Sequence, residues 1–570
     1  MIPAESPIKK QITLPPFFLL DLQRSLNIGA HQMFRSSIRI LSLAIILPVT
    51  FPGLAQTCAG DPDLLFTNGV ILTMDDTGSM AHNLRIRGDE IITVDESPGS
   101  TETCTTVIDL GGRTVIPGLI DSHTHFIRTA QAPGPFIFGQ ESASTIAQYQ
   151  AALAEAAQDA EPGEWIVAVG GLTPLQFEEK RLPTSEELTT AVPENPVWIQ
   201  RGYLADGTVN DQGRRVLIER GIPVSEDGIS RAEDGGLTYI LRTRSDERML
   251  HRFRQYMAYA VSTGLTTVVD QGCCDFLGAH LDIDDRPNFS IVNRLWRQNE
   301  LKLKMRLQYD HRDILDQDDL RSVSARVLNA TLGMGDDFYR TVGVGERVIA
   351  DEASDDEVFE AYLNVAKAGW PLSQHTIRED EIERYLRIME RVAQVEPLDG
   401  LRWSLEHIFE ITPEQIERLK SIGISVRVQD HDVLRNGSTG WNPGPPLKTL
   451  LESGIRMGAG TDSGVVGPLN PWLSLYFMVT GKHMGGEVII PGEQIGRLDA
   501  LRLYTASNAW FLGEEDSLGT LEAGKKADLV VLDKPFLDIE ADAISSIQPL
   551  MTVVNGRIVF GRDEFSSLAE

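Results

Sequence analysis

Two histidines separated by one residue follow an apolar run near position 120. His123 and His125 come after Val115-Ile-Pro-Gly-Leu-Ile-Asp-Ser. Alternate residues of a strand face the same way, so the two imidazoles would lie side by side at a strand end. Imidazole nitrogens held at rigid positions suit a divalent metal such as zinc. Two ordinary surface histidines are the alternative for this pair taken alone.

Other residues of metal-ligand type close other predicted strands. His375 ends Trp370-Pro-Leu-Ser-Gln-His, His407 ends Leu401-Arg-Trp-Ser-Leu-Glu-His, and Asp462 follows Arg456-Met-Gly-Ala-Gly-Thr. The carboxyl ends of barrel strands converge on one mouth. We therefore expect these three side chains to meet the two histidines of the first motif.

Short β-rich runs alternate with helical runs through the middle of the chain, which is typical of a parallel sheet. Eight such runs favour a closed (β/α)8 barrel. The eight candidate strands are Val115–Asp121, Thr266–Asp270, Met305–Tyr309, Thr341–Gly345, Trp370–Gln374, Leu401–Glu406, Ser425–Gln429 and Ile455–Gly460.

The two ends of the chain have a different pattern. Residues 64–109 and 527–560 alternate apolar and polar residues and contain turn dipeptides such as Asn68-Gly69, so both ends predict β pieces of one sheet domain. The stretch at about 127–250 is too long for a βα loop. We read it as an insertion that roofs the strand ends.

The composition excludes some functions. The chain has 570 residues, 52 Lys and Arg, and 82 Asp and Glu, so its formal net charge is -30. Such a charge repels phosphate backbones and disfavours nucleic acid as a partner. The mean hydropathy of -0.13 excludes a multispan membrane protein. The expected partner is a small-molecule substrate.

The N-terminus predicts an export signal. Arg35 and Arg39 precede the apolar run Ile40–Val49, and small residues follow up to Ala55. This order predicts a signal peptide that starts near Met33 and is cleaved near Ala55, which places the mature protein in the periplasm or outside the cell. An uncleaved anchor is disfavoured because two prolines interrupt the apolar segment, so we expect no stable membrane span after cleavage.

Four cysteines are few for a disulfide scaffold of this size. Cys58 and Cys104 flank predicted strands of one small domain and could pair in an exported protein. Cys273 and Cys274 are adjacent, so their side chains would point apart, and packing is the simpler role.

Four motifs together resemble the amidohydrolase superfamily, and the long insertion makes the chain most similar to amidohydrolase family 3. The motifs are Val115-Ile-Pro-Gly-Leu-Ile-Asp-Ser-His-Thr-His, Leu405-Glu-His, Gly460-Thr-Asp-Ser and Leu518-Gly-Thr-Leu-Glu-Ala-Gly-Lys-Lys-Ala-Asp-Leu-Val-Val-Leu. The resemblance spans roughly Leu64 to Phe560. It implies a distorted TIM barrel with a composite β-sandwich formed by both chain ends.

The resemblance also implies how the chain divides. Residues 1–55 would be the N-terminal extension and signal peptide, 56–113 the first part of the sandwich, 114–515 the metal-dependent barrel with its insertion, and 516–570 the second part of the sandwich.

The resemblance assigns roles to the strand-end residues. His123 and His125 would bind the more buried metal, and His375 and His407 the second, with one or two divalent ions, expected to be zinc. Asp462 would contact a metal and act as the general base. Iron, manganese, cobalt or nickel would fit similar ligands.

One departure from the family pattern affects the second metal. Many relatives bridge two metals with a carboxylated lysine after the fourth strand, but residues 341–351 contain no lysine. Glu346 stands at about that position and supplies a carboxylate directly. A salt bridge between Glu346 and Arg347 is the alternative, and the site would then hold a single metal.

A second departure affects substrate recognition. Relatives often carry Asp-Gly-His in the insertion, and here Ala205 occupies the histidine position, with Tyr203 or Asp206 as substitutes. Asp270 would line the pocket or cap a helix. His431 would bind substrate or lie in an exposed loop. Trp472 would form an apolar wall or pack in the core, which is the commoner fate of such a residue.

The function predicted from these residues is hydrolysis of non-peptide carbon–nitrogen bonds in amides, cyclic amides or N-acyl compounds by a metal-activated hydroxide. A lactone or ester hydrolase on the same site is one alternative, and a non-catalytic ligand-binding barrel is the other. The sequence leaves open the oligomeric state, a homo-oligomer included.

Overall fold

The computed structural model describes residues 63–95, 104–170, 172–201, 206–272, 288–311, 322–429, 444–464 and 467–569. The predicted signal peptide, with Met33 and Ala55, lies outside them, and so do Tyr203, Ala205, Cys58, Cys273, Cys274 and His431. Cys104 is disulfide-bonded. No helix of the described residues is long and apolar enough to cross a membrane.

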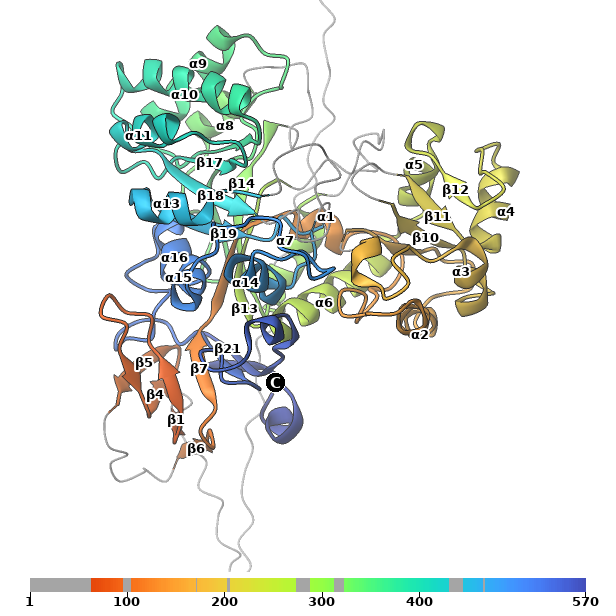
Figure 1. Cartoon of the computed structure of the whole chain (residues 1–570), viewed down its shortest axis with the longest axis horizontal. Helices are drawn as coiled ribbons and strands as arrows, with labels where there is room; N and C mark the ends of the chain where they lie inside the picture. The colour runs from red at the N-terminus through yellow and green to blue at the C-terminus, as the bar shows by residue number, and fades with distance from the viewer. Residues whose placement is uncertain are drawn as a thin grey trace, which may run out of the picture. The chain divides into compact units, whose positions relative to one another are not determined.

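The strands that were predicted to form the barrel lie in two parallel four-stranded sheets. The first sheet has the order β15-β14-β13-β8 and the second the order β16-β17-β18-β19. Figure 1 labels β13 and β14 of the first sheet and β17, β18 and β19 of the second. Their bounds are β8 Leu119–Thr124, β13 Leu265–Asp270, β14 Lys304–Tyr309, β15 Tyr339–Val344, β16 Ser373–Thr376, β17 Ser404–His407, β18 Ser425–Gln429 and β19 Met457–Gly460. Each predicted strand therefore has a counterpart, shifted by a few residues.

Single bridges connect the two sheets at both of their edges. Thr124 of β8 pairs with Ser463 beyond β19, and Val344 of β15 pairs with Leu372 before β16. The described residues thus form two half sheets with hydrogen bonds across two seams, and no continuous ladder closes them into one barrel.

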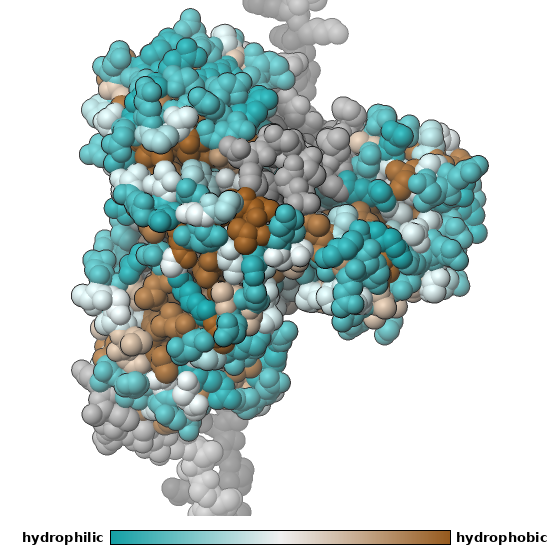
Figure 2. All heavy atoms as spheres, viewed as in Figure 1, coloured by the Kyte–Doolittle hydropathy of each residue, from teal (hydrophilic) through white to brown (hydrophobic). Residues whose placement is uncertain are grey.

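Helices connect the strands and cover the half sheets. Their bounds are α1 Phe126–Ala130, α6 Asp246–Ser262, α7 Ser290–Arg297, α8 Ser322–Asn329, α9 Asp355–Lys367, α10 Glu379–Ala393, α11 Pro413–Ser421, α13 Leu447–Ser453, α14 Pro471–Thr480, α15 Arg497–Leu503 and α16 Ala506–Leu512. On the face drawn in Figure 2, the surface over α9–α11 is mainly hydrophilic, while the inward faces of these helices join the largest hydrophobic core.

Capping fixes where several of these helices begin. Ser354 accepts a hydrogen bond from the backbone N–H of Glu357, and Glu357 accepts one from the backbone N–H of Ser354, which makes a capping box at the start of α9. Three acidic residues in the first turn of α9 also interact favourably with the positive end of the helix dipole.

Both ends of the chain contribute to one six-stranded sheet, in the order β22-β21-β20-β7-β2-β3, which brings β7 beside strands from the far end of the sequence (Figure 1). A four-stranded sheet, β5-β4-β1-β6, shares its hydrophobic core. The bounds are β1 Asp63–Thr67, β2 Val70–Leu72, β3 Met80–Ala81, β4 Leu84–Arg87, β5 Glu90–Val94, β6 Thr105–Asp109, β7 Thr114–Pro117, β20 Leu529–Leu532, β21 Pro549–Val554 and β22 Arg557–Gly561.

The first predicted strand differs from the structure, because the run Val115–Asp121 is divided between two sheets. Thr114–Pro117 is β7 of the six-stranded sheet, and Leu119–Thr124 is β8 of the first half sheet. The change of sheet falls at Gly118, between these two strands. A Cβ at Gly118 would lie 2.3 Å from the Thr266 hydroxyl, which explains why glycine occupies this crossing.

The predicted insertion has a sheet of its own, in the order β12-β11-β10-β9. Its elements are α2 Ile146–Ala157, β9 Ile166–Ala168, α3 Ser185–Ala191, β10 Val197–Gln200, β11 Gly207–Val209, α4 Asp211–Glu219, β12 Ile229–Ser230 and α5 Gly236–Leu241. Gly170, after β9, lies against Gly464 and Gly467, which follow Asp462. The insertion therefore contacts the mouth formed by the strand ends.

Candidate metal centre

The seam between β8 and β19 brings three of the predicted ligands together. His123 and His125 lie at the end of β8, and Asp462 follows β19. The Asp462 N–H donates to the His123 carbonyl at 2.8 Å, and the His125 N–H donates to the Ser463 carbonyl at 3.0 Å. Backbone hydrogen bonds across the seam thus hold these side chains at one level.

The other three predicted ligands lie at the seam between β15 and β16 and on the neighbouring strand β17. Glu346 follows β15, and its carbonyl accepts the backbone N–H of His375 at 2.9 Å. His407 is the last residue of β17, next to β16. The Nε2 atom of His407 lies 2.9 Å from Nδ1 of His375. All six predicted ligand residues therefore come from strand ends and face one volume.

The spacing of the potential ligand atoms suits bound cations. His125 Nε2 lies 3.2 Å and His123 Nε2 3.6 Å from Asp462 Oδ1. Four ligands placed tetrahedrally at about 2.1 Å from zinc lie about 3.4 Å apart. Two sets of three, His123 with His125 and Asp462, and His123 with Glu346 and His407, have their ligand atoms within 4.8 Å of one another.

Glu346 stands between the two pairs of histidines. Its Oε1 lies 3.6 Å from His125 Nε2, and its Oε2 lies 2.7 Å from His375 Nδ1 and 3.4 Å from His407 Nε2. Arg347, the alternative partner, instead has its Nε 3.3 Å from a carboxylate oxygen of Asp351. A carboxylate so placed can reach a cation on either side.

Burial makes this cluster costly without a cation. His123 and His407 are 0% exposed, and Glu346 and Asp462 are 5% exposed. Buried charges in proteins are paired or bound to metals. His123 Nε2 makes no hydrogen bond with any residue that the structure describes, although it faces two carboxylates. The donor set therefore fits one or two divalent cations.

The two histidines of the first motif differ in their electrostatics. Burial disfavours the charged form of His123, but the carboxylates of Asp462, Glu406 and Glu346 outweigh burial and raise its pKa to about 9. Burial, together with the nearby Arg128, lowers the pKa of His125 to about 4. A buried centre that favours positive charge at one imidazole is suited to a cation.

Two of the ligand residues have unusual backbone conformations. The φ angle is 66° at His407 and 49° at Asp462, which is the left-handed region that residues other than glycine rarely adopt. Such conformations cost about 1–3 kcal/mol each and persist where surrounding contacts hold them, as at functional sites. The cross-seam hydrogen bond of the Asp462 N–H is one such contact.

The structure distinguishes the alternatives for two further predicted residues. Asp270 ends β13 and is buried, and its Oδ2 accepts the Ile127 N–H at 2.7 Å, so it caps α1 directly after His125. Trp472 is 1% exposed and donates its indole N–H to the Thr263 carbonyl. This burial agrees with the packing alternative for Trp472. Tyr203 and His431 lie outside the described residues.

Sequence analysis missed two buried acids beside the ligands. Asp121 accepts hydrogen bonds from the His123 N–H and from the hydroxyl of Thr461, so it ties β8 to the end of β19. Glu406 accepts from His123 Nδ1 at 2.9 Å. Asp121 is two residues before His123, and Glu406 directly precedes His407. This closeness in the sequence was the signal that could have indicated them.

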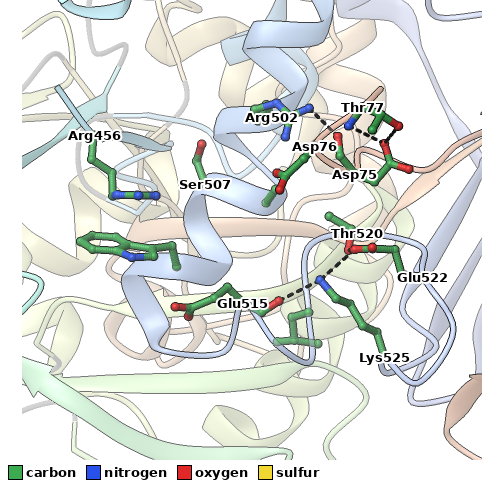
Figure 3. A pocket seen from close by; sticks show the side chains of 13 residues that line it. Asp75, Asp76, Thr77, Arg456, Arg502, Ser507, Glu515, Thr520, Glu522 and Lys525 are labelled. Atoms are coloured by element: carbon green, nitrogen blue, oxygen red, sulfur yellow. Dashed lines mark hydrogen bonds and ion pairs between the residues drawn. The ribbon is translucent and has the colours of Figure 1, made fainter. Parts of the chain in front are cut away.

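A separate cavity of about 550 Å³ contains none of the six ligand candidates (Figure 3). Its lining comes from residues 75–77, α15, α16 and residues 515–525, with Arg456. Most of its charged groups bind one another or nearby carbonyls: Arg502 donates to the Met74 and Asp75 carbonyls, and Lys525 donates to the Glu515 carbonyl. This cavity is therefore distinct from the cluster of ligand candidates.

Parallel strands that carry buried imidazoles and carboxylates at their carboxyl ends define a metal-dependent α/β enzyme. A model of the amidohydrolase family matches residues 106–560. The chain belongs to the amidohydrolase family, and it is a hydrolase that acts on carbon–nitrogen bonds. The family resemblance found in the sequence is thus confirmed.

Proteins of similar sequence or fold match most of this chain. N-substituted formamide deformylase from Arthrobacter pascens is 22% identical over 547 residues, covering 88% of this chain and 98% of that protein. An uncharacterized metal-dependent hydrolase from Pyrococcus furiosus superposes with a TM-score of 0.57 at 20% identity, covering 84% and 100%. An atrazine chlorohydrolase variant from Arthrobacter aurescens TC1, complexed with zinc and atraton, gives 0.51 at 18% identity, covering 87% and 95%.

A buried carboxyl group near the mouth predicts a pH-dependent stability. Glu141 accepts the Leu469 N–H at 2.9 Å and the Tyr259 hydroxyl, and burial raises its pKa from 4.5 to about 7. Because the folded pKa is raised, the folded state loses stability as the pH rises from 4.5 to 7. Glu141→Gln, which keeps both contacts, should gain up to about 3 kcal/mol relative to the native protein over this range.

Urea unfolding at several pH values measures this difference. Glu187→Gln is the control, because Arg181 lowers the Glu187 pKa to about 2 and the relative stability of that variant should change only below pH 4.5. A Glu141→Gln variant whose relative stability is the same at pH 4.5 and pH 7 would contradict the assignment.

Proposed function

We propose that this protein hydrolyses small N-acyl compounds, such as N-substituted formamides, amides or cyclic amides, at a two-zinc centre. The observation that carries the proposal is the position of Glu346 between the His123–His125 pair and the His375–His407 pair. The likeness to a formamide deformylase over 98% of its length supports the N-acyl class.

We propose a role for each ligand residue. His123 and His125 would hold one ion, His375 and His407 would hold the other, and Glu346 would supply a carboxylate to both. When bound, zinc lowers the pKa of a coordinated water to about 7 and polarises a scissile carbonyl. Asp462 Oδ1, 3.2 Å from His125 Nε2, accepts a proton from the attacking water and returns it to the leaving nitrogen.

We propose that the two half sheets, joined at the seams, form a distorted TIM barrel. The two sheets that include β7 and β1 would then form a composite β-sandwich from both chain ends. The seam hydrogen bonds of His125, Asp462 and His375 support this interpretation, because they continue the strand-to-strand pairing through the ligand residues.

The metal stoichiometry tests the bridging role. Elemental mass spectrometry of protein purified without added metal or chelator should find about two zinc ions per chain, falling towards one in Glu346→Ala because the shared ligand is lost. About one ion in both proteins would remove Glu346 from the centre. The absence of metal in both, even after reconstitution, would favour the non-catalytic ligand-binding alternative.

The proton-transfer role of Asp462 predicts a separate effect. Asp462→Asn keeps an oxygen ligand but cannot take a proton at neutral pH, so turnover should fall by at least about 100-fold, within the range for loss of a general base. The assay uses N-substituted formamides, N-acyl amino acids and lactones, with zinc content measured in parallel. Wild-type turnover in a zinc-loaded Asp462→Asn variant would contradict the role. Faster turnover of lactones than of amides would favour the ester-hydrolase alternative.

We also propose that the protein is exported after cleavage near Ala55. The motif from Arg35 to Ala55 supports this location. N-terminal sequencing of the protein from the periplasm or medium should begin at or close to Gln56. A mature protein that retains Met33, or that begins within the barrel segment, would contradict the cleavage.

A further inference from the structure

Two consecutive residues of β17 reach the metal centre. Successive residues of a strand normally face opposite sides. His407 has a φ of 66°, which turns the chain after Glu406 and brings both side chains to the same centre. Glu406 Oε2 lies 2.9 Å from His123 Nδ1, while His407 Nε2 lies 3.4 Å from Glu346 Oε2.

Hydrogen bonding fixes which atom of His123 carries a proton. The backbone N–H of His407 can only donate, so the side-chain atom of Gln429 that lies 2.8 Å away is the carbonyl oxygen. The amide nitrogen of Gln429 then donates to Glu406 Oε2 at 3.0 Å. Because a carboxylate only accepts, His123 Nδ1 donates to it, and the lone pair of a neutral imidazole stands at Nε2.

The second oxygen of Glu406 is also held. Oε1 lies 2.8 Å from Arg427 Nε and accepts the Ser404 hydroxyl at 2.9 Å. Arg427 in turn donates to the Ser122 carbonyl, next to His123. Glu406 is 0% exposed, so no bulk water competes for these contacts. The carboxylate therefore has one orientation, with Oε2 directed at His123.

We propose that Glu406 is a positioning residue that holds His123 in the tautomer and orientation needed to bind the metal. This inference rests on the proposed function, since it takes His123 as a ligand. The Gln429 amide links Glu406 with the backbone of His407, so one network orients ligands on both sides of the centre. Loss of a carboxylate partner behind a ligand histidine typically weakens metal binding by about 10–100-fold.

The rival explanation is that Glu406 serves only to neutralise the buried Arg427. The two explanations predict different results when the whole ion pair is removed. Glu406→Met with Arg427→Met leaves no unpaired buried charge and no acceptor for His123 Nδ1, so a purely structural role predicts native zinc affinity. A positioning role predicts that zinc affinity stays about 10–100-fold lower than in the native protein.

The experiment measures zinc affinity by competition with a chromophoric chelator, and thermal unfolding in parallel, on the full mature chain. The variants are Glu406→Met, the double variant and Glu514→Met. Glu514 is the matched control, because it is also a buried carboxylate, bound through both oxygens to Arg306, but lies outside the metal centre. Glu514→Met should lose stability while its zinc affinity stays within about twofold of the native value.

A folded double variant that binds zinc as tightly as the native protein overturns the positioning role and leaves the proposed function intact. A native protein that binds no zinc overturns both. If the double variant does not fold, Gln429→Met provides the test, since it leaves the Glu406–Arg427 pair in place but removes the hydrogen bonds to Glu406 and His407. Zinc affinity about tenfold lower supports the inference, and unchanged affinity overturns it.

Discussion

Buried carboxylates facing buried imidazoles are the constraint on which this protein depends. Glu346, Asp462 and Glu406 are all nearly or fully inaccessible to solvent, and they surround His123 at 2.9–3.8 Å. Such a cluster is unfavourable by itself, because each carboxylate has lost most of its hydration. A divalent cation would neutralise the negative charge of this cluster. Arg427 neutralises the charge of Glu406 alone.

Backbone hydrogen bonds hold the ligand residues in place at the two seams. His125, Asp462 and His375 all use their backbone N–H groups to bind the neighbouring strand end, so the ligands are rigid although the sheet ladder there is reduced to single bridges. Beyond β19, where a single bridge replaces the ladder, the chain takes the left-handed conformation at Asp462. At the seams, backbone hydrogen bonds of the ligand residues thus replace the regular strand ladder.

Two buried ion pairs connect the first half sheet with the C-terminal part of the chain. Lys304 on β14 forms a buried ion pair with Asp528, and Arg306 on the same strand binds Glu514, so the first half sheet is fastened to the C-terminal part of the chain. Among the described residues, the strand ends carry the ligand candidates, and Gly170 of the insertion lies against Gly464, two residues after Asp462. This division, with chemistry at the carboxyl ends of strands and support elsewhere, is general in barrel enzymes.

The sequence by itself determined the strands and the six strand-end residues, because the periodicity of a strand and the spacing of His123 and His125 are local properties. Only the tertiary structure decided the rest. The division at Gly118, the burial of Trp472 and the contact of Glu406 with His123 depend on segments far apart in the chain. Such contacts follow from the register between strands and from packing, and neither leaves a periodic trace in the sequence.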